Sequence, residues 1–424
     1  MQFGDIRGIL QYATQFRGKT FVVNVDGLIV AREGFSNLLL DIAVLHSLNI
    51  RTVLVHGAGF QIRELAASRG IELSNDDGTG LTDEATLQVS IDAVTRLHGE
   101  LMQRLTTAGL QAVAGNVVIA KPAGIVNGVD QLMTGTIDRI DVPRLETFLK
   151  EGMLPVVGPL GYDQRGQMLR VNSDAVALAI ATALKAEKLL FVTGHRITDE
   201  EGTRFNIPVA EAEQLAKSER IAASSRLSSI FKFAIAACNE GVSRSHILDG
   251  RENEVLLAEL FSNEGVGTMI HGDDYDQIRE ARPEDVPEVM ALIQASIANA
   301  ELAPRTQQEI MDKLDDYALL EIDGNIVGTV AIHFFREENV AELACLFVKR
   351  DHEHRGHGRR MVGFAEKRAR RLGALKIFAL STQATGFFSN IAGFREAGLD
   401  ELPPQKLALI SEQRRNSLVF VKTL

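Results

Sequence analysis

Residues 20–57, TFVVNVDGLIVAREGFSNLLLDIAVLHSLNIRTVLVHG, decide the fold of the first part of the chain. The apolar run at 21–30 predicts a buried strand, 35–48 predicts a helix, and 51–58 predicts a second strand. Short strands rich in β-branched residues that alternate with longer helices indicate a mainly parallel sheet covered on both faces. The alternation continues to about residue 270, so the sequence predicts one large three-layer α/β domain.

The pattern changes after the polar stretch HGDDYDQ at 271–277, which suits a linker. A strand at 277–282, a hairpin at 317–335 and a strand, turn, helix and strand after it predict an α+β domain. We therefore expect a short N-terminal helix at 1–18, a first domain at 19–272 and a second domain at 278–424.

The composition argues against several classes of protein. The 424 residues carry a net charge of −11, which disfavours binding to nucleic acid or to anionic membranes. The two cysteines, Cys238 and Cys345, lie too far apart in the sequence for a disulfide framework or a zinc cluster, so we expect no metal site and a reducing compartment. No apolar run reaches the roughly 18 residues of a membrane helix, and MQFGDIRGIL does not resemble a secretory signal. We expect a cytoplasmic protein.

A glycine-containing turn is the sharpest local feature of the second domain. It reads EHRGHGR at 353–359, between a predicted strand at 341–348 and a predicted helix from Met361. Main-chain N–H groups that converge at a helix N-terminus suit a diphosphate. The segment from Lys349 to Arg371 contains nine Lys and Arg residues and three Asp and Glu residues. This positive balance further favours binding of an anion. The alternative is a tight turn followed by a solvated basic helix face.

The order of elements in this domain resembles the GNAT superfamily of acetyl-CoA-dependent N-acetyltransferases. EARPEDVPEVMALI at 280–293 opens the domain, and GFFSNIAGF at 386–394 lies near its end. The phosphate loop of that superfamily reads Arg/Gln-x-x-Gly-x-Gly/Ala, and Glu353 stands here in place of its Arg or Gln. The resemblance implies acetyl-CoA as a co-substrate and no separate cofactor. It assigns acetyl-CoA contacts to Cys345, Leu346, Val348, His354, Arg355, Gly356 and Gly358.

Acetylation of an amine needs a base for the attacking nitrogen. The resemblance implies Glu342, on the strand before the phosphate loop, acting directly or through water. A solvated strand residue is the alternative role. Strict alternation would place Glu342 and Cys345 on opposite faces, and a bulge of the kind that GNAT members carry in this strand would change that.

The departing thiolate needs a proton donor. Many GNAT enzymes place a Tyr near the last aromatic-rich helix, where this chain has Phe387 and Phe388. The available hydroxyls are those of Ser381 and Thr382, and we take Ser381 as the catalytic candidate. Cys345 as a nucleophile is a weaker hypothesis, because a buried Cys on a strand is usually a small hydrophobic residue.

The first domain resembles the amino acid kinase family. The resemblance rests on VHGAGFQI at 55–62, on the first strand and on 171–194. In that family the first strand ends in Lys-x-Gly-Gly, and the Lys steadies the transferring phosphoryl group. Here Asn24 replaces the Lys and Asp26 adds a negative charge, so phosphoryl transfer is electrostatically opposed. The polar positions that persist are Asn172, Asp174 and Lys232.

Two further segments, 245–251 and 259–268, resemble the arginine-inhibited branch of the kinase family. A strand, a helix and a glycine C-cap would be the structural alternative. The resemblance assigns the L-arginine site to Tyr12, His246, Glu259 and Gly265.

A kinase-like domain followed by a GNAT domain is the architecture of the N-acetylglutamate synthase family, and the resemblance covers nearly the whole chain. It implies acetyl transfer to the α-amine of L-glutamate in arginine biosynthesis, regulation by L-arginine, and a homo-oligomer, a hexamer built partly through the N-terminal helix. A bifunctional synthase and kinase, or an arginine sensor without catalysis, are the alternatives. The implied glutamate contacts are Arg305, Lys406, Arg415 and Ser417.

Overall fold

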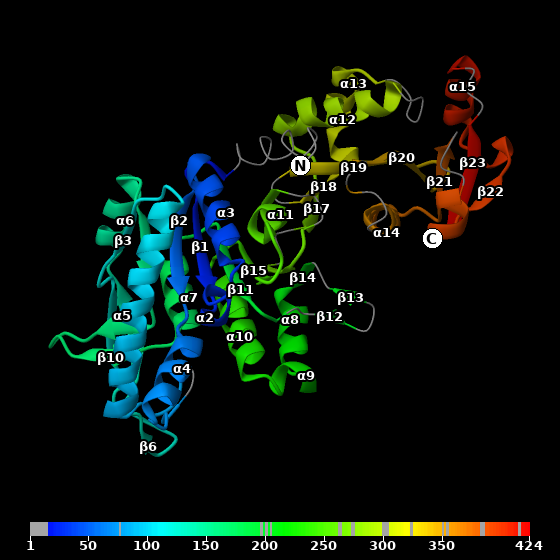
Figure 1. Ribbon diagram of the computed structural model, residues 1–424. Coiled ribbons are helices and arrows are strands. Elements are labelled where there is room, and N and C mark those ends of the chain that lie inside the picture. Colours follow the sequence, from blue (N-terminus) through cyan, green and yellow to red (C-terminus); the bar gives the residue numbers. More distant parts are fainter. Residues whose placement is uncertain are drawn as a thin grey trace. The chain divides into compact units, whose positions relative to one another are not determined.

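The computed structural model divides into two compact units, Met1–Gly272 and Asp273–Leu424. Each unit is described by itself (Figure 1). The structure describes the chain from Phe16 onward except for residues 76–77, 196–197, 200–201, 204–205, 262–264, 273–275, 299–304, 323–324, 350–351, 353–355, 382–385 and 414–416. None of the helices in these described ranges is long and apolar enough to cross a membrane.

The first unit is built on an eight-stranded sheet, counted over the described residues. Its neighbouring strands pair in parallel where the ladders are given, except β15 and β16, which are antiparallel. The predicted mainly parallel sheet is therefore confirmed. The order across the sheet is β14 (Asn206–Pro208), β16 (Thr268–His271), β15 (Arg244–Asp249), β11 (Lys188–Thr193), β1 (Thr20–Val25), β2 (Arg51–His56), β8 (Leu154–Val157) and β3 (Ala112–Ala114).

Helices cover both faces of this sheet (Figure 1). Alternate residues of β1 show why: Phe21 and Val23 belong to one apolar core, and Val22 belongs to the other. Helices α3 (Phe35–Ser47), α4 (Gly59–Arg69), α5 (Glu84–Thr107) and α11 (Val255–Phe261) contribute to the first core. Helices α6 (Val142–Lys150), α7 (Ser173–Ala183), α8 (Val209–Ala216), α9 (Glu219–Ala222) and α10 (Ser225–Asn239) contribute to the second.

The strand predicted at 21–30 is too long. β1 ends at Val25, and Gly27–Val30 form the single helical turn α2. The main chain at Gly27 approaches the next loop so closely that a Cβ there would lie 3.0 Å from the carbonyl oxygen of Gly57. This close approach leaves no room for a continued strand with side chains, and it puts Asp26 at the carboxyl end of the sheet.

The first unit also carries a smaller sheet beside the large one. Its strands, among the residues described, are β10 (Met168–Arg170), β9 (Leu160–Tyr162), β4 (Val118–Pro122) and β7 (Gly135–Ile140).

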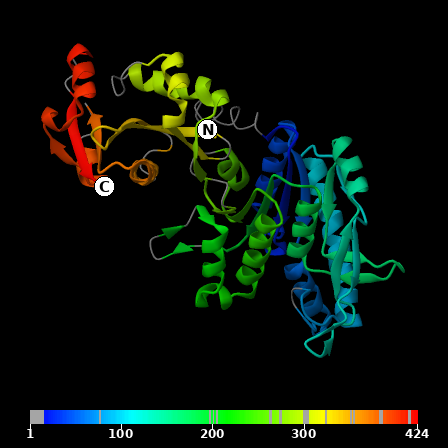
Figure 2. The same cartoon turned by 180° about the vertical axis from the view of Figure 1, so that it is seen from behind.

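The second unit is a seven-stranded sheet over the described part of the chain, and Figure 2 shows it from behind. Its ladders are antiparallel except between β20 and β21, which confirms the α+β prediction. The order is β17 (Asp276–Glu280), β18 (Tyr317–Ile322), β19 (Asn325–Phe335), β20 (Val340–Val348), β21 (Lys376–Ser381), β23 (Leu418–Thr423) and β22 (Arg395–Ala397).

One face of this sheet packs against α14 (His357–Leu372), through Met361, Ala365 and Ala369. The helix begins four residues before the predicted start, because Gly356 already adopts the left-handed conformation that precedes it. The opposite face packs against α12 (Val286–Ala298), α13 (Gln307–Asp312) and α15 (Pro404–Gln413).

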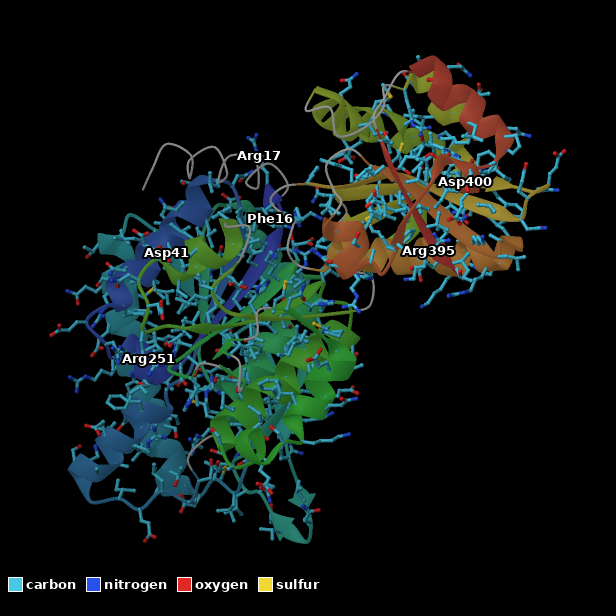
Figure 3. All side chains as sticks on the ribbon, turned by 90° about the vertical axis from the view of Figure 1, so that its right-hand side faces the viewer. Phe16, Arg17, Asp41, Arg251, Arg395 and Asp400 are labelled. Carbon is cyan, nitrogen blue, oxygen red and sulfur yellow. The ribbon has the colours of Figure 1, made fainter. Side chains whose placement is uncertain are left out.

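Asp41, labelled in Figure 3, is a buried carboxylate that joins α3 to α11. Its Oδ2 accepts a hydrogen bond of 3.2 Å from the main-chain N–H of Leu256, in the first turn of α11. Burial raises the pKa of Asp41 from 3.8 to about 6, although the N–H groups of Leu256 and Leu257 oppose the rise. The folded protein therefore holds this proton more tightly than the unfolded chain does. Ionisation of Asp41 then lowers stability as the pH rises from about 4 through 6.

We expect Asp41→Asn, which keeps an oxygen acceptor without the charge, to be more stable than the wild type near pH 8, by at most about 3 kcal/mol. The difference should vanish near pH 4, where the wild-type carboxyl is also neutral. Urea unfolding followed by circular dichroism across this pH range measures it. Asp92→Asn is the control, because its exposed carboxylate has a pKa lowered by Arg69 and should show no such gain. Equal stability of Asp41→Asn and the wild type near pH 8 would contradict the prediction.

Candidate active site and effector site

β20 parts from β21 halfway along its length. The parallel ladder runs from Val340↔Lys376 to Leu343↔Ala379, whereas the ladder with β19 continues to Val348. In the described part of the chain, the main chain of Leu346 and Val348 thus has no ladder partner on the β21 side. This is where the sequence predicted that acetyl-CoA pairs with main chain.

A β-bulge marks the point of departure. Cys345 has a positive φ of 49°, and the β19–β20 register shifts beside it. Ala344 and Cys345 consequently both face the core formed with α12 and α13. The bulge therefore brings Cys345 to the face that Glu342 shares, which strict alternation would have excluded.

The turn predicted to bind phosphate leads into the start of α14. Gly356 has a φ of 79°, a conformation that favours glycine. Gly358 packs on Phe387, whose ring carbons would lie 3.2 Å from an added Cβ. Two different constraints thus require the two glycines, and the first N–H groups of a 16-residue helix follow them. His354 and Arg355 lie outside the described residues.

Glu342 is a buried carboxylate with a cation beside it. Its side chain is 6% exposed, and Oε1 lies 2.6 Å from Nζ of Lys406 on α15. The sequence assigned Lys406 to glutamate, but in this structure it contacts the predicted base. The two assignments are compatible only if Lys406 is shared between Glu342 and the substrate.

Arg305 lies in the same charged cluster. Burial opposes its positive charge, but the nearby Cys345, Tyr317 and Glu342 outweigh burial, so the pKa of Arg305 is raised. A cation of this kind, held near a base, suits a substrate carboxylate. Arg415 lies outside the described residues, and Ser417 directly precedes β23.

Tyr317 belongs to this cluster and was missed by the sequence analysis. Its hydroxyl lies 3.7 Å from Sγ of Cys345, and burial is the main cause that raises the pKa of Tyr317. Burial also raises the pKa of the Cys345 thiol, which keeps it protonated and argues against a nucleophilic role. The sequence signal for Tyr317 was weak, because this residue is simply the first residue of an apolar hairpin.

Ser381 lies on the other side of the strand opening. It ends β21 and follows Ile377 and Ala379, which face α14, while Glu342 lies opposite Phe378 on the other face. Alternation therefore places the predicted acid and the predicted base on opposite faces, with the gap between β20 and β21 separating them. Thr382 lies outside the described residues.

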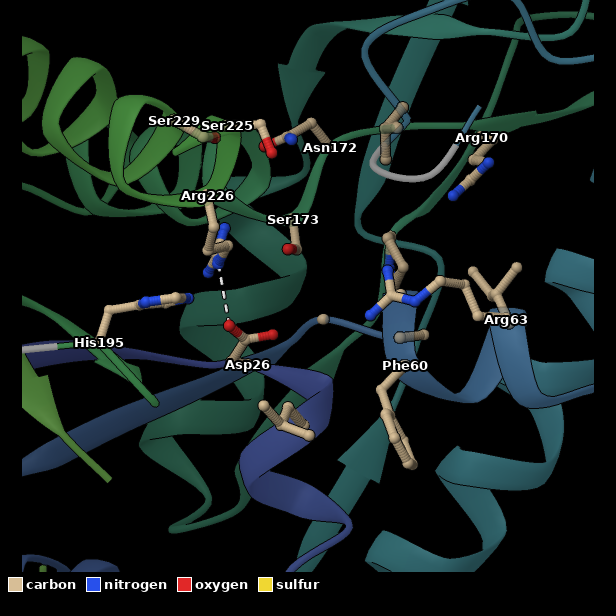
Figure 4. Close-up of a pocket in the computed structure, with 17 residues that line it drawn as sticks. Asp26, Phe60, Arg63, Arg170, Asn172, Ser173, His195, Ser225, Arg226 and Ser229 are labelled. Atoms are coloured by element: carbon tan, nitrogen blue, oxygen red, sulfur yellow. Dashed lines mark hydrogen bonds and ion pairs between the residues drawn. The ribbon is translucent and has the colours of Figure 1, made fainter. Parts of the chain in front are cut away.

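The first unit holds a cavity of about 310 Å³ at the carboxyl end of its sheet (Figure 4). Asp26 and Arg226 meet there, with Nε of Arg226 2.9 Å from the Asp26 carboxylate. Arg226 also reaches Asp174 at 2.5 Å, and Asn24 donates a hydrogen bond of 2.7 Å to Asp174.

The negative charge that Asp26 adds to this cavity has a cationic partner. Arg226, which the sequence analysis did not single out, neutralises it, and the two carboxylates outweigh burial to raise the pKa of Arg226. Lys232 instead lies over the ring of Phe233, 5.2 Å from its centroid. Arg226 is thus held by two protein carboxylates, which is a poor arrangement for stabilising a transferring phosphoryl group, and Arg63 and Arg170 also line the cavity.

Three of the predicted effector residues, His246, Glu259 and Gly265, lie together in the first unit, and the side chains of His246 and Glu259 are buried. Nδ1 of His246 lies 2.6 Å from Oε1 of Glu259, and Oε2 accepts hydrogen bonds of 2.7 and 2.8 Å from the N–H groups of Val266 and Gly267. Gly265 has a φ of 62°, and a Cβ there would lie 2.9 Å from Oε2. The carboxylate of Glu259 therefore already has hydrogen-bond partners in the protein, so it is not simply vacant for the guanidinium of an arginine ligand.

The protonation of this cluster follows from its contacts. Burial, and then Lys188, lowers the pKa of His246, so the ring is neutral near pH 7. His246 then donates from Nδ1 to Glu259, and Nε2 accepts from Nζ of Lys188 at 3.3 Å. Hydrogen bonds from His246 and the main chain outweigh burial and lower the pKa of Glu259. Tyr12 lies outside the described residues.

Comparison with known proteins agrees with both halves of this geometry. Residues 19–249 match the amino acid kinase family, and residues 285–394 match the acetyltransferase (GNAT) family. The fold and site therefore define a GNAT-type acetyltransferase joined to an amino acid kinase-like domain.

Relatives that align with nearly the whole chain identify a narrower class of acetyltransferase. An amino-acid acetyltransferase of Azotobacter vinelandii is 34% identical over 429 residues, covering 99% of this chain and 98% of the relative. One of Ralstonia nicotianae is 33% identical over 435 residues, covering 100% and 96%. The crystal structure of N-acetylglutamate synthase from Neisseria gonorrhoeae, complexed with coenzyme A and L-arginine, is 31% identical, with a TM-score of 0.87 and complete coverage of both chains. The chain belongs to the N-acetylglutamate synthase family of amino-acid acetyltransferases.

Proposed function

We propose that this protein transfers the acetyl group of acetyl-CoA to the α-amine of L-glutamate and that L-arginine, bound by the kinase-like unit, regulates the reaction. The observation that carries the proposal is the buried cluster of Glu342, Lys406 and Arg305 beside the opening between β20 and β21. The gonococcal synthase, in a second structure with a TM-score of 0.65, is complexed with coenzyme A and N-acetyl-glutamate.

Acetyl-CoA fits the opening by its chemistry. Its pantetheine amides need main-chain partners, which β20 offers near Cys345, Leu346 and Val348 where β21 has left it. Its diphosphate suits the N-terminus of α14 at Gly356 and Gly358, with His354 and Arg355 as the adjoining candidates. The thioester then lies between the two faces of the sheet.

The reaction follows from the placement of the two candidate catalytic groups. Glu342 removes a proton from the amine, and the nitrogen attacks the thioester carbonyl carbon. The tetrahedral intermediate collapses, the C–S bond breaks, and the thiolate takes a proton from Ser381 on the opposite face, which water replaces. Opposite faces suit these roles, because the nucleophile and the leaving group lie on different sides of the reacting carbon.

Two carboxylates of L-glutamate need two cationic groups. Arg305 and Arg415 are the candidates for bidentate contacts, with Ser417 and Lys406 beside them. Lys406 would turn from Glu342 to a substrate carboxylate, and this would free Oε1 of Glu342 to accept the proton. The substrate thereby helps to activate its own base.

The arginine site would use Glu259, His246 and the main chain at Gly265, with Tyr12 from the N-terminal segment. The assembly would be a homo-oligomer, and we propose a hexamer in which that segment takes part. The buried carboxylate of Glu259, which is ionised at neutral pH, supports a guanidinium ligand.

The proposal is tested by thiol release from acetyl-CoA with a panel of amino acids. L-Glutamate should be the best acceptor, and L-glutamine should react about 10 to 100 times more slowly, because one buried cation then lacks its charged partner. Equal turnover of both would contradict the substrate assignment. Arginine binding without any thiol release would instead indicate a sensor.

Replacement of the base should act on the rate. We expect Glu342→Gln to lower the maximal rate about 100-fold or more at saturating substrate, because the amide keeps the shape and loses the basicity. Glu337→Gln, in the exposed turn between β19 and β20, is the matched control and should behave as the wild type. A maximal rate unchanged in Glu342→Gln would assign the base elsewhere.

Replacement of the effector carboxylate should act on arginine binding. We expect Glu259→Gln to weaken L-arginine binding about 10 to 100 times, because a charged hydrogen bond in a buried site is lost. Isothermal titration calorimetry measures this, with thermal unfolding as a check of the fold. Glu252→Gln, on the exposed loop before α11, is the control. An undiminished affinity in Glu259→Gln would exclude this cluster as the arginine site.

A further inference from the structure

A histidine lies directly opposite the predicted base on the neighbouring strand. His333 on β19 is the direct partner of Glu342 in the β19–β20 ladder, so both side chains lie on the face opposite α14. Directly opposed residues in an antiparallel pair have Cβ atoms about 4.5 to 5.5 Å apart. The side chains of His333 and Glu342 therefore project side by side from this face.

A carboxylate orients this histidine from behind. Nδ1 of His333 lies 2.6 Å from Oδ2 of Asp316, which ends the short 3₁₀ turn Leu314–Asp316 before β18. The ring also packs edge to face on Tyr317, with 6.4 Å between the centroids. A carboxylate only accepts hydrogen bonds, so the neutral ring carries its proton on Nδ1 and a lone pair on Nε2.

The other nitrogen of this ring is unpartnered. His333 is 8% exposed, and its Nε2 is buried without a hydrogen-bond partner among the residues that the structure describes. A buried polar atom left without a partner costs free energy. An Asp–His pair whose free lone pair lies on the face of the base is, in contrast, the arrangement that accepts a proton.

The chemistry of the proposed reaction requires such an acceptor. An α-amine is largely ammonium near neutral pH. Its conversion to an amide removes two N–H protons, of which the departing CoA sulfur accounts for one. Each turnover therefore releases one net proton, and Glu342, with 6% of its side chain exposed, has little direct contact with water.

We propose that His333 carries this net proton away from Glu342. The O–H bond of the protonated Glu342 breaks, a bond from the proton to Nε2 forms, and the imidazolium is stabilised by Asp316. Asp316 takes the Nδ1 proton and passes it to water, and rotation of the ring returns the remaining N–H to Asp316, which restores a lone pair toward Glu342. The side chain of Asp316 is 36% exposed, so this end of the pair meets solvent.

This inference rests on the proposed function, and His333 acts through Glu342, not on the substrate. The charged and titratable groups that surround the relay are Asp316, Tyr317 and Glu342, with Arg305 and Lys406 beyond Glu342.

The test compares His333→Gln, Asp316→Asn and Asp315→Asn in the full-length protein. Asp315 is the neighbouring exposed carboxylate, and its variant is the control. We expect His333→Gln to lower the maximal rate about 10 to 100 times, Asp316→Asn to lower it less, and Asp315→Asn to match the wild type. The KM for glutamate and the calorimetric affinity for coenzyme A should stay within about twofold in His333→Gln.

Two further readouts separate proton transfer from a structural role. The ascending limb of the pH–rate profile that reports the histidine should disappear in His333→Gln. Imidazole at constant pH should restore rate to a His333→Ala variant in proportion to its concentration, because it supplies the missing acceptor. Double replacement of His333 and Asp316 should cost no more than the single replacement of His333.

The outcomes are distinguishable. A wild-type maximal rate and pH profile in His333→Gln overturn the inference while leaving the proposed function intact. A reduced rate that imidazole does not restore, together with weakened coenzyme A binding, shows a structural role and also overturns it. A wild-type protein that releases no thiol with glutamate overturns the proposed function, and the relay falls with it.

Discussion

The left-handed backbone at Cys345 is the constraint on which the second unit depends. Because the chain bulges there, Ala344 and Cys345 face the same core, and β20 leaves β21 after Leu343. The departure leaves main chain of β20 without a ladder partner on the β21 side, where we propose that acetyl-CoA binds. The same bulge places Cys345 on the face of Glu342. A regular strand would close the sheet and bury the groups that the reaction needs.

The buried carboxylates of the two units differ in the cation that pairs with them. Glu342 is paired with Lys406, a single ammonium on a flexible side chain, at 2.6 Å. Asp26 and Asp174 share Arg226, which is fixed between them and donates to both. A guanidinium held on two sides cannot be displaced at low cost, because each carboxylate would then be buried without its partner. The first arrangement leaves the carboxylate a partner that can be exchanged, and the second fixes both carboxylates on one guanidinium.

The sequence predicted the fold well where a local pattern reports it, and the candidate site residues stay predictions. Alternating apolar strands and helices are visible in 20–57, Gly356 has a positive φ, and Gly358 lies against the ring of Phe387. The partners of Glu342 and Asp26 were not predictable in this way. Lys406 lies 64 positions from Glu342 and Arg226 lies 200 positions from Asp26, and only tertiary packing brings them together.

The roles of Tyr317 and His333 were also not predictable from a local sequence pattern. Both lie in an apolar hairpin, where a single polar residue carries no motif. Their positions become informative only when the register pairs His333 with Glu342 and the turn brings Asp316 to the ring. The first strand was predicted too long for a related reason. Its true end depends on the approach of Gly27 to Gly57, which lies in a loop more than twenty residues away.

The effector cluster leads from Glu259 toward the N-terminal segment through direct contacts. Glu259 holds Nδ1 of His246, Nε2 of that ring accepts from Lys188, and Nζ of Lys188 lies 5.1 Å above the ring of Phe16. A guanidinium that takes the place of His246 on Glu259 removes the hydrogen bond that fixes the imidazole tautomer. Lys188, whose pKa burial holds well below its usual value, then faces a ring with different hydrogen-bonding needs. Because a ligand shifts an equilibrium only through differential affinity, this chain of contacts can carry regulation only if Phe16 packs differently once Lys188 moves.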